Sequence, residues 1–223
     1  MRVDVKICGL TSPAALAAAI DSGARYVGLV FYPPSPRSVG LDVAAELARM
    51  VPTGVRAVGL FVDPTDEALE ATVRRVPLDM LQLHGHETPE RVADIRARFA
   101  MPVMKAVRVA EPADLDHVPA HAAVADRLLF DAKPPQNVAA LPGGNGIPFD
   151  WSILAGKHWP VPWMLSGGLT VDNVGEALAD TGATAVDVSS GVESRPGVKD
   201  PAKIAAFMRA VTAAAVGSEV SAL

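Results

Sequence analysis

The chain has 223 residues, of which 50% are hydrophobic and only 5% aromatic, and its formal net charge is −5. This length fits a single domain, and the apolar share excludes an intrinsically disordered chain. The mildly acidic balance, with no cluster of Lys and Arg, argues against nucleic acid as a partner.

The ends of the chain and its cysteine content indicate where the protein works. Charges at Arg2, Asp4 and Lys6 interrupt the N-terminal segment, which therefore does not resemble a secretion signal, and no later segment approaches the ~18 apolar residues of a membrane span. The single cysteine, Cys8, cannot form an internal disulfide. We therefore expect a cytoplasmic protein without a membrane or nucleic-acid partner.

Short apolar runs alternate along the chain with Ala- and Leu-rich stretches. The runs expected to form strands are 3–8, 26–31, 55–62, 79–83, 103–109, 127–131, 161–165 and 185–188. The stretches expected to form helices are 12–23, 42–50, 65–75, a helix starting at 88–89, 112–119, 150–155, 171–180 and 201–214, with a fraying tail at 217–223. Ser-Pro at 12–13 and Thr-Pro at 88–89 are typical helix starts.

Eight strand–helix units of about 28 residues each predict a single (β/α)₈ TIM barrel over residues 1–223. The strands are continuous apolar runs, as expected where helices cover a parallel sheet. A doubly wound open sheet would show the same alternation and remains the alternative. The count of eight and the lack of an early Gly-x-Gly-x-x-Gly motif favour the barrel. The segment 133–149 is too long for an ordinary turn and is interpreted as a mobile active-site element.

Barrel enzymes build their active sites at the C-terminal ends of the strands, so polar residues at those ends are the candidates. These residues are Lys6, Cys8, Arg37, Asp63, Gln82, His84, Arg108, Asp131, Ser166, Asp187, Ser189 and Ser190. Two of the ends carry glycine turns, 166–168 and 189–191, in the seventh and eighth units. Backbone N–H groups of such turns commonly bind phosphate, although the glycines would also suit ordinary tight turns.

Cys8 and Asp131 are the candidates for proton transfer. A lone cysteine in an apolar strand is usually a core residue, but Cys8 ends its strand, and Lys6 on the same face could favour the thiolate. Asp131 could instead cap a helix, although Pro134 and Pro135 follow it rather than a helix. A thiol and a carboxyl group facing each other across the barrel mouth would suit general base and general acid catalysis.

Arg37 follows Pro36 in the segment 35–38 and could hold a carboxylate, or it could be a solvated loop charge. His84 and His86 are expected to serve structure or hydrogen bonding. The five histidines show no metal-ligand spacing with acidic or thiol partners, so no metal site is expected.

The motifs at these strand ends together resemble the phosphoribosylanthranilate isomerase family of tryptophan biosynthesis, over nearly the whole chain. They are KICGLT at 6–11, GLVF at 28–31 with SPR at 35–37, GLFV at 59–62, LQLHG at 81–85, LFD at 129–131, GGNG at 143–146 before FDW at 149–151, SGGL at 166–169, NV at 173–174, DVSSGVE at 187–193 and PGVKD at 196–200. Phe130 and Ser166 depart from the residues usual in the family, leucine and alanine, without removing a functional group.

The resemblance implies an aldose–ketose isomerase that converts N-(5-phosphoribosyl)anthranilate to 1-(2-carboxyphenylamino)-1-deoxyribulose 5-phosphate by an Amadori rearrangement, without a cofactor. Asp131 would be the general acid that opens the sugar ring, and Cys8 the general base that removes the C2 proton. The resemblance assigns the remaining substrate-binding roles, for carboxylate, sugar, phosphate and lid, to Arg37, His84, Gly144, Gly146, Gly168, Asp187, Ser190 and Gly191.

Other functions remain open at this point. Indole-3-glycerol phosphate synthase shares the phosphate-binding glycine turns. It would need a catalytic set of Lys and Glu residues, which the ends of the second, third and fifth strands lack. The related isomerase of histidine biosynthesis typically has an aspartate where Cys8 stands. A phosphosugar-binding barrel without activity would have no need of both Cys8 and Asp131. The expected partner is a small phosphorylated substrate, and the chain is expected to be a monomer or a homodimer.

Overall fold

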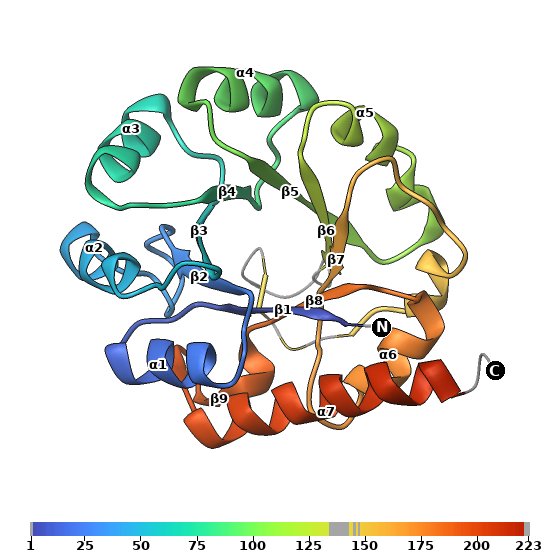
Figure 1. The fold of residues 1–223 in the computed structure, drawn as a ribbon. Helices are drawn as coiled ribbons and strands as arrows, with labels where there is room; N and C mark the ends of the chain where they lie inside the picture. Colours follow the sequence, from blue (N-terminus) through green and yellow to red (C-terminus); the bar gives the residue numbers. More distant parts are fainter. Residues whose placement is uncertain (1, 134–142, 145, 147, 221–223) are drawn as a thin grey trace.

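The computed structural model describes residues 2–133, 143–144, 146 and 148–220. Eight parallel strands form a closed barrel in chain order, and the helices surround it as an outer ring (Figure 1). The strands are β1 (Asp4–Cys8), β2 (Tyr26–Val30), β3 (Arg56–Phe61), β4 (Met80–Leu83), β5 (Val103–Val109), β6 (Arg127–Ala132), β7 (Trp163–Leu165) and β8 (Ala185–Val188). Because β1 pairs with β8, the predicted barrel is confirmed and the open sheet is excluded.

The helices follow the strands as the sequence pattern predicts, and Ser12, Thr65 and Thr88 cap three of them through their side-chain oxygens. The α-helices are α1 (Pro13–Asp21), α2 (Leu41–Arg49), α3 (Asp66–Arg75), α4 (Pro89–Phe99), α5 (Val118–Ala122), α6 (Val174–Thr181) and α7 (Pro201–Val220). Three short 3₁₀ turns are η1 (Pro112–Leu115), η2 (Trp151–Leu154) and η3 (Ser190–Val192). Helix α7 packs against α1 and α6 and so joins the two ends of the chain.

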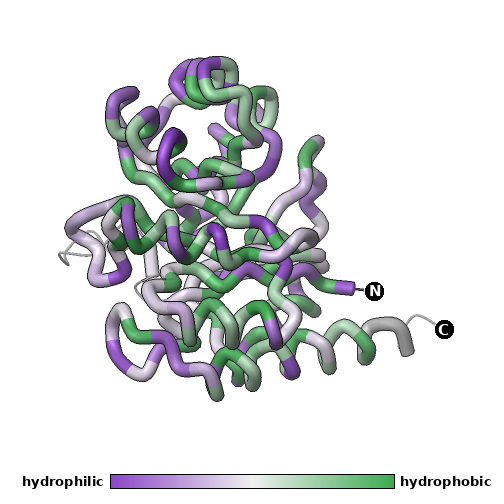
Figure 2. The backbone as a smooth tube through the Cα atoms, turned by 60° about the vertical axis from the view of Figure 1, so that its left-hand side comes forward, coloured by the Kyte–Doolittle hydropathy of each residue, from purple (hydrophilic) through white to green (hydrophobic). Residues whose placement is uncertain are grey.

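Helices α2, α3 and α4 mix hydrophobic and hydrophilic residues and each buries some of the hydrophobic ones, whereas α1 is apolar almost throughout (Figure 2). Helix α2, for example, buries Ala44, Ala45, Leu47 and Ala48 against the barrel. Both faces of the strands are covered, which explains their continuous apolar sequences. In the part of the chain that the structure describes, no helix is long and apolar enough to cross a membrane.

Alternate residues of each strand point into the barrel, where the lower layers are apolar and the C-terminal mouth is polar. The apolar interior cluster consists of Tyr26, Val58, Met80, Met104, Ala106, Leu129, Met164 and Ala185. The same alternation places Lys6 and Cys8 on one face of β1, and Gln82 and His84 in line with Met80 along β4. The barrel therefore directs its functional side chains towards one end.

Some element boundaries differ from the expected ones. The predicted helix 112–119 is two short pieces, η1 and α5, because the Asp114 carboxylate accepts the N–H groups of Ala110 and Glu111 and closes a tight turn. Helix α6 begins at Val174 rather than 171, since the Asn173 side chain bonds the backbone of the preceding turn. Helix α7 continues to Val220, past the expected end at 214 and into the tail expected to fray, because the alanine-rich sequence tolerates one glycine.

The sequence pattern does not predict the antiparallel hairpin of β9 (Glu193–Arg195) and β10 (Val198–Lys199). The Pro-Gly pair at 196–197 is its turn signal, and Gly197 has a φ of +80°, which favours glycine. The expected active-site loop 133–149 lies largely outside the described residues. Of that loop, only 133, 143–144, 146 and 148–149 can be placed.

Candidate active site

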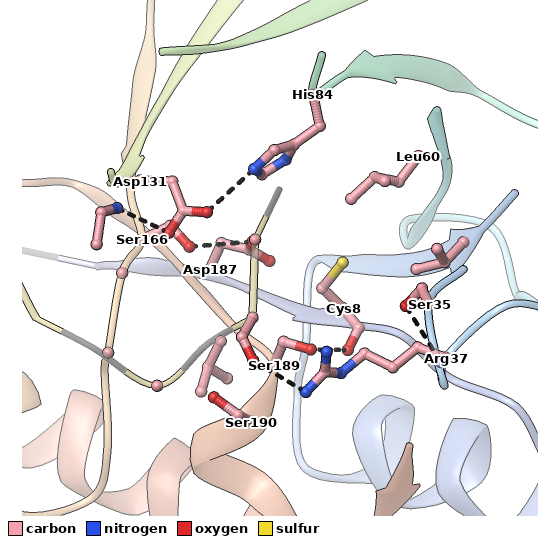
Figure 3. Close-up of a pocket in the computed structure, with 18 of the residues that line it drawn as sticks. Cys8, Ser35, Arg37, Leu60, His84, Asp131, Ser166, Asp187, Ser189 and Ser190 are labelled. Carbon is pink, nitrogen blue, oxygen red and sulfur yellow. Dashed lines mark hydrogen bonds and ion pairs between the residues drawn. The ribbon is translucent and has the colours of Figure 1, made fainter. Parts of the chain in front are cut away.

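A pocket of about 800 Å³, open to solvent, lies at the C-terminal mouth of the barrel. Figure 3 shows Cys8, Arg37, His84, Asp131 and Asp187 around it. The predicted site residues that line it are Cys8, Arg37, His84, Asp131, Gly144, Gly146, Gly168, Asp187 and Ser190. Gly191 does not line the pocket but packs against its wall at Leu169. Strands at opposite sides of the barrel thus contribute to one cavity.

Cys8 belongs to a buried polar group at the centre of the mouth. The Lys6 ammonium lies 3.0 Å from Asp187 Oδ1 and is fully buried, close enough to the Cys8 thiol for each to shift the other's pKa. A Cβ on Gly28 would lie only 3.0 Å from the Cys8 sulfur and 3.1 Å from Lys6 Nζ, so only glycine leaves room for both groups. Cys8 is therefore not an ordinary apolar core cysteine.

Burial and charge act in opposite directions on these groups. Burial raises the pKa of the Cys8 thiol, and the neighbouring Asp187 carboxylate raises it further; Lys6 lowers it, but not enough to reverse the sign. Lys6 favours the thiolate, as expected from the sequence, but the pKa of Cys8 is nevertheless raised overall. Burial also disfavours the Lys6 ammonium, but Asp187 and Cys8 outweigh this and raise its pKa. Lys6 therefore stays charged beside the thiol.

Asp131 faces the same space from β6, on the other side of the pocket (Figure 3). Its Oδ2 lies 3.0 Å from His84 Nε2, and its Oδ1 accepts the N–H of Ala132 at 3.0 Å. His84 Nδ1 in turn lies 3.0 Å from Gln82 Nε2. Asp131 lies inside a strand and does not cap a helix, so the capping interpretation is wrong.

Arg37 is held by a buried carboxylate that the sequence analysis did not assign. Its Nε and Nη2 donate to the two oxygens of Glu193 at 2.8 and 2.9 Å, and Lys199 Nζ donates to Glu193 Oε1 at 2.6 Å. Burial raises the pKa of Glu193, but Arg37 and Lys199 outweigh it and leave that pKa lowered. Arg37 is only 5% exposed and is therefore not a solvated loop charge. Arg37 also lines the pocket.

The two glycine turns lie against each other, as phosphate-binding loops would require. A Cβ on Gly191 would come within 2.0 Å of the Leu169 carbonyl oxygen, so the close contact between the loops depends on glycine. Asn173 Nδ2 donates to the Gly168 carbonyl at 3.0 Å and fixes the first loop. Ser189 Oγ donates to the Cys8 carbonyl at 3.1 Å and fixes the second loop to β1.

Three glycines of the long loop approach the catalytic groups closely. A Cβ on Gly143 would lie 2.8 Å from both Asp131 Oδ2 and His84 Nε2, and one on Gly144 would lie 2.6 Å from Arg37 Nη1. The Gly144 carbonyl accepts from Arg37 Nη2 at 3.1 Å, and Gly146 lies over Ser190. The absence of side chains thus leaves the polar groups accessible at the pocket.

Sequence reasoning missed roles for Gln82, Gly143, Glu193 and Lys199. Gln82 precedes His84 by two residues, so the alternation of a strand could have placed both on one face. Glu193 contacts Arg37 across 156 residues, and no local sequence pattern indicates that pair. Lys105 on β5 does not serve this pocket, because its ammonium pairs with Glu87 at 2.8 Å outside it. Among the described residues, no group of three or more His, Cys, Asp or Glu side chains could hold a metal ion.

Comparison with known proteins decides the family. Residues 5–210 match the family of N-(5'-phosphoribosyl)anthranilate (PRA) isomerases. The chain belongs to this family. A curated relative, the N-(5'-phosphoribosyl)anthranilate isomerase of Rhodospirillum centenum, is 64% identical over 213 residues, which are 96% of this chain and 100% of the relative. The isomerase expected from the motifs is confirmed at the level of the family.

Solved structures of the PRA isomerase family have the same fold. The phosphoribosylanthranilate isomerase of Thermotoga maritima superposes with a TM-score of 0.83 at 35% identity, and covers 95% of this chain and 99% of its own. Another isomerase of the family was solved in complex with reduced 1-(o-carboxyphenylamino)-1-deoxyribulose 5-phosphate; it gives a TM-score of 0.80 at 33% identity, with 95% and 99% coverage.

Proposed function

We propose that this chain catalyses the isomerisation of N-(5'-phosphoribosyl)anthranilate to 1-(2-carboxyphenylamino)-1-deoxyribulose 5-phosphate, with Cys8 and Asp131 as its proton-transfer groups. One observation carries the assignment of residues. The thiol on β1 and the carboxyl group on β6 face the same pocket, each beside a buried polar partner, Lys6 for Cys8 and His84 for Asp131. Such a pair can remove a proton from carbon and deliver another to oxygen.

Asp131 opens the sugar ring in the first step. Its carboxyl proton goes to the furanose ring oxygen as the bond from that oxygen to C1 breaks, and the lone pair of the anthranilate nitrogen forms a C1–N iminium. The carboxylate that remains accepts hydrogen bonds from His84 Nε2 and the Ala132 N–H, both at 3.0 Å. These donors stabilise the charge that develops on Asp131 in this step.

Cys8 completes the rearrangement as the base. The thiolate removes the C2 proton, which the iminium makes acidic, and the electron pair of that bond neutralises the nitrogen to give an enolamine. This enolamine becomes the ketone by moving the O2 proton to C1. Burial raises the pKa of Cys8, so fewer molecules hold a thiolate at neutral pH, but each thiolate is a stronger base. The nearby Lys6 ammonium stabilises it.

The remaining pocket residues hold the substrate. Nη1 of Arg37 binds the anthranilate carboxylate, while Nε and Nη2 stay with Glu193 and Nη2 also donates to the Gly144 carbonyl. The aromatic ring packs against Val30, Leu60 and Val62, which line the same pocket. The phosphate takes hydrogen bonds from the backbone of Gly168, Ser190 and Gly191. Asp187 and His84 lie beside the sugar, while Gly144 and Gly146 approach from the long loop.

The reaction is redox-neutral within one molecule, so we propose that it needs no cofactor. We also propose that the enzyme works in the cytoplasm, as a monomer or a homodimer, on a small phosphorylated substrate and without nucleic acid. A single barrel over residues 1–223 carries the whole activity in this proposal, since every assigned residue lines or adjoins one pocket.

The direct test follows the fluorescence of phosphoribosylanthranilate after addition of the purified protein. We expect a catalysed loss of fluorescence, and a fall of about 10²–10⁴-fold in turnover for Cys8→Ser, because a serine hydroxyl forms almost no alkoxide near neutral pH. Binding of a reduced product analogue should change little in that variant. No loss of fluorescence with the wild-type protein would refute the function, and normal turnover by Cys8→Ser would refute the role of Cys8.

A further inference from the structure

Gln82 is a buried polar residue that the mechanism above does not use. It lies on β4 in register with Leu60 of β3 and Met104 of β5, and its exposed fraction is 0%. His84 follows two residues later on the same face of the chain. The apolar side chains of the barrel interior, such as Met80 and Met104, surround this level of the barrel. A polar amide at this depth requires an explanation.

The contacts of Gln82 determine which nitrogen of the His84 ring carries a proton. The Gln82 amide nitrogen is a donor and lies 3.0 Å from His84 Nδ1, so Nδ1 accepts and carries no proton. The proton of the neutral ring is then on Nε2, which lies 3.0 Å from Asp131 Oδ2 and donates to it (Figure 3). Gln82 therefore donates a hydrogen bond to His84, and His84 donates one to Asp131.

The arrangement leaves one polar atom of Gln82 without a partner. Its carbonyl oxygen Oε1 is buried and accepts no hydrogen bond from any residue in the described part of the chain. An unpaired buried carbonyl destabilises a fold, and a methionine of similar length would remove that cost. Arg108 contacts His84 only at its backbone carbonyl, at 2.9 Å, and so cannot orient the ring. The contact with the ring is the one benefit that the amide provides.

We propose that Gln82 is a positioning residue for the acid step, because its amide N–H keeps His84 in the neutral form protonated on Nε2. This role rests on the proposed function: the tautomer gives Asp131 a donor that stabilises the carboxylate formed when the sugar ring opens. Gln82 acts through His84 and does not touch the substrate.

The first test is ¹⁵N NMR of the wild-type protein labelled at histidine, with His84→Asn used to identify the His84 signals. The two ring nitrogens have very different shifts when protonated and unprotonated. We expect an unprotonated Nδ1 and a protonated Nε2 near neutral pH. A protonated Nδ1, in either the other tautomer or the imidazolium, would overturn the proposal. This readout needs no variant of Gln82 and no substrate.

The second test compares Gln82→Met and Gln82→Glu with a matched control, Leu81→Met, on the face of β4 that packs against the outer helices. Gln82→Met should melt at the same or a higher temperature and yet lose about 10–100-fold in kcat with little change in KM, a typical loss for a group that orients an active-site imidazole. Gln82→Glu should convert His84 to the imidazolium, because its carboxylate accepts from Nδ1, and should lose more activity. The control should retain its kcat.

The outcomes separate this proposal from the proposed function. A wild-type protein that shows the expected tautomer but does not isomerise phosphoribosylanthranilate would refute the function and leave the link from Gln82 to His84 intact. An active wild-type protein whose Gln82→Met variant keeps full kcat, or loses kcat only in proportion to its stability, would refute the positioning role alone.

Discussion

At the scale of single residues, Lys6 most directly controls the proposed base. A fully buried ammonium is tolerated only when it is paired, and Asp187 at 3.0 Å is its partner. Its charge lowers the pKa of Cys8, while burial and Asp187 raise it. The net result is a raised pKa, so the fraction of Cys8 thiolate should increase with pH through neutrality and into the alkaline range.

Replacing Lys6 should move this pH dependence in a defined direction. In Lys6→Gln the largest influence that lowers the pKa of Cys8 is lost, although Lys199 still lowers it, and Asp187 loses its buried cation. The Cys8 thiolate should therefore form at higher pH than in the wild type, and the rate at pH 7 should fall. The measurement is a pH–rate profile of both proteins. An unchanged profile would mean that Lys6 does not act on the base.

At the scale of elements, the β9–β10 hairpin and the two phosphate loops bring the substrate-binding groups into place. The hairpin provides Glu193 and Lys199, and Lys199 Nζ also bonds the Ser189 carbonyl at 3.0 Å. One buried carboxylate thus connects Arg37 on one side of the pocket to the eighth-strand loop on the other. Changes in these elements should affect binding and stability more than the chemical step.

Glu193→Gln should destabilise the fold in a pH-dependent way. Removing one partner from a buried charge cluster costs roughly 3–5 kcal/mol. Because the folded-state pKa of Glu193 is lowered, its stabilising contribution is present above the pKa of the unfolded carboxyl and is lost as pH falls towards the lowered value. Thermal unfolding curves of wild type and variant should therefore differ most near neutral pH and converge in acid.

The control for this prediction is Glu70→Gln, which removes an exposed ion pair with Arg74 on α3. Such pairs contribute less than about 1 kcal/mol, so its Tm should stay close to that of the wild type at every pH. Equal effects of the two substitutions would show that Glu193 is not part of a buried network.

Gly191→Ala should weaken phosphate binding by separating the two loops. Its Cβ would lie 2.0 Å from a backbone oxygen, Leu169 O, which can move only with its loop. Loss of one charge-assisted backbone hydrogen bond corresponds to roughly 10–150-fold in KM. Gly175→Ala on α6 is the matched control, since its nearest neighbour would be 3.9 Å away and alanine favours helix. A normal KM in Gly191→Ala would exclude this loop contact from phosphate binding.

At the scale of the whole molecule, the order of elements and the polar strand ends were predictable because both depend on local sequence. Eight apolar runs suffice for the barrel, and the barrel itself brings Cys8 and Asp131 to one mouth. The Arg37–Glu193 pair could not be predicted, since it joins residues far apart in sequence. The raised pKa of Cys8 was also missed, because desolvation depends on how deeply the fold buries the thiol and not on its neighbours in sequence.

The closed barrel also explains why acid and base remain separate. Strands β1 and β6 are not neighbours in the sheet, so Asp131 pairs with His84 while Cys8 pairs with Lys6. The two proposed proton-transfer groups would thus meet only through a substrate bound between them. The central claim is that Asp131 is the acid of this pair and not a structural residue.

Asp131→Asn tests that claim most directly, with turnover of phosphoribosylanthranilate and Tm measured on the same preparation. Asparagine keeps the shape but has no acidic proton to transfer, and its single carbonyl oxygen can accept only one of the two N–H groups, of His84 and Ala132, that the carboxylate accepts. We expect turnover to fall by about 10²–10⁴-fold, with a fall in Tm no larger than the loss of one hydrogen bond explains, and a reduced, ring-opened product analogue to bind as before. Turnover close to that of the wild type, or a loss that only follows a fall in Tm, would contradict the account.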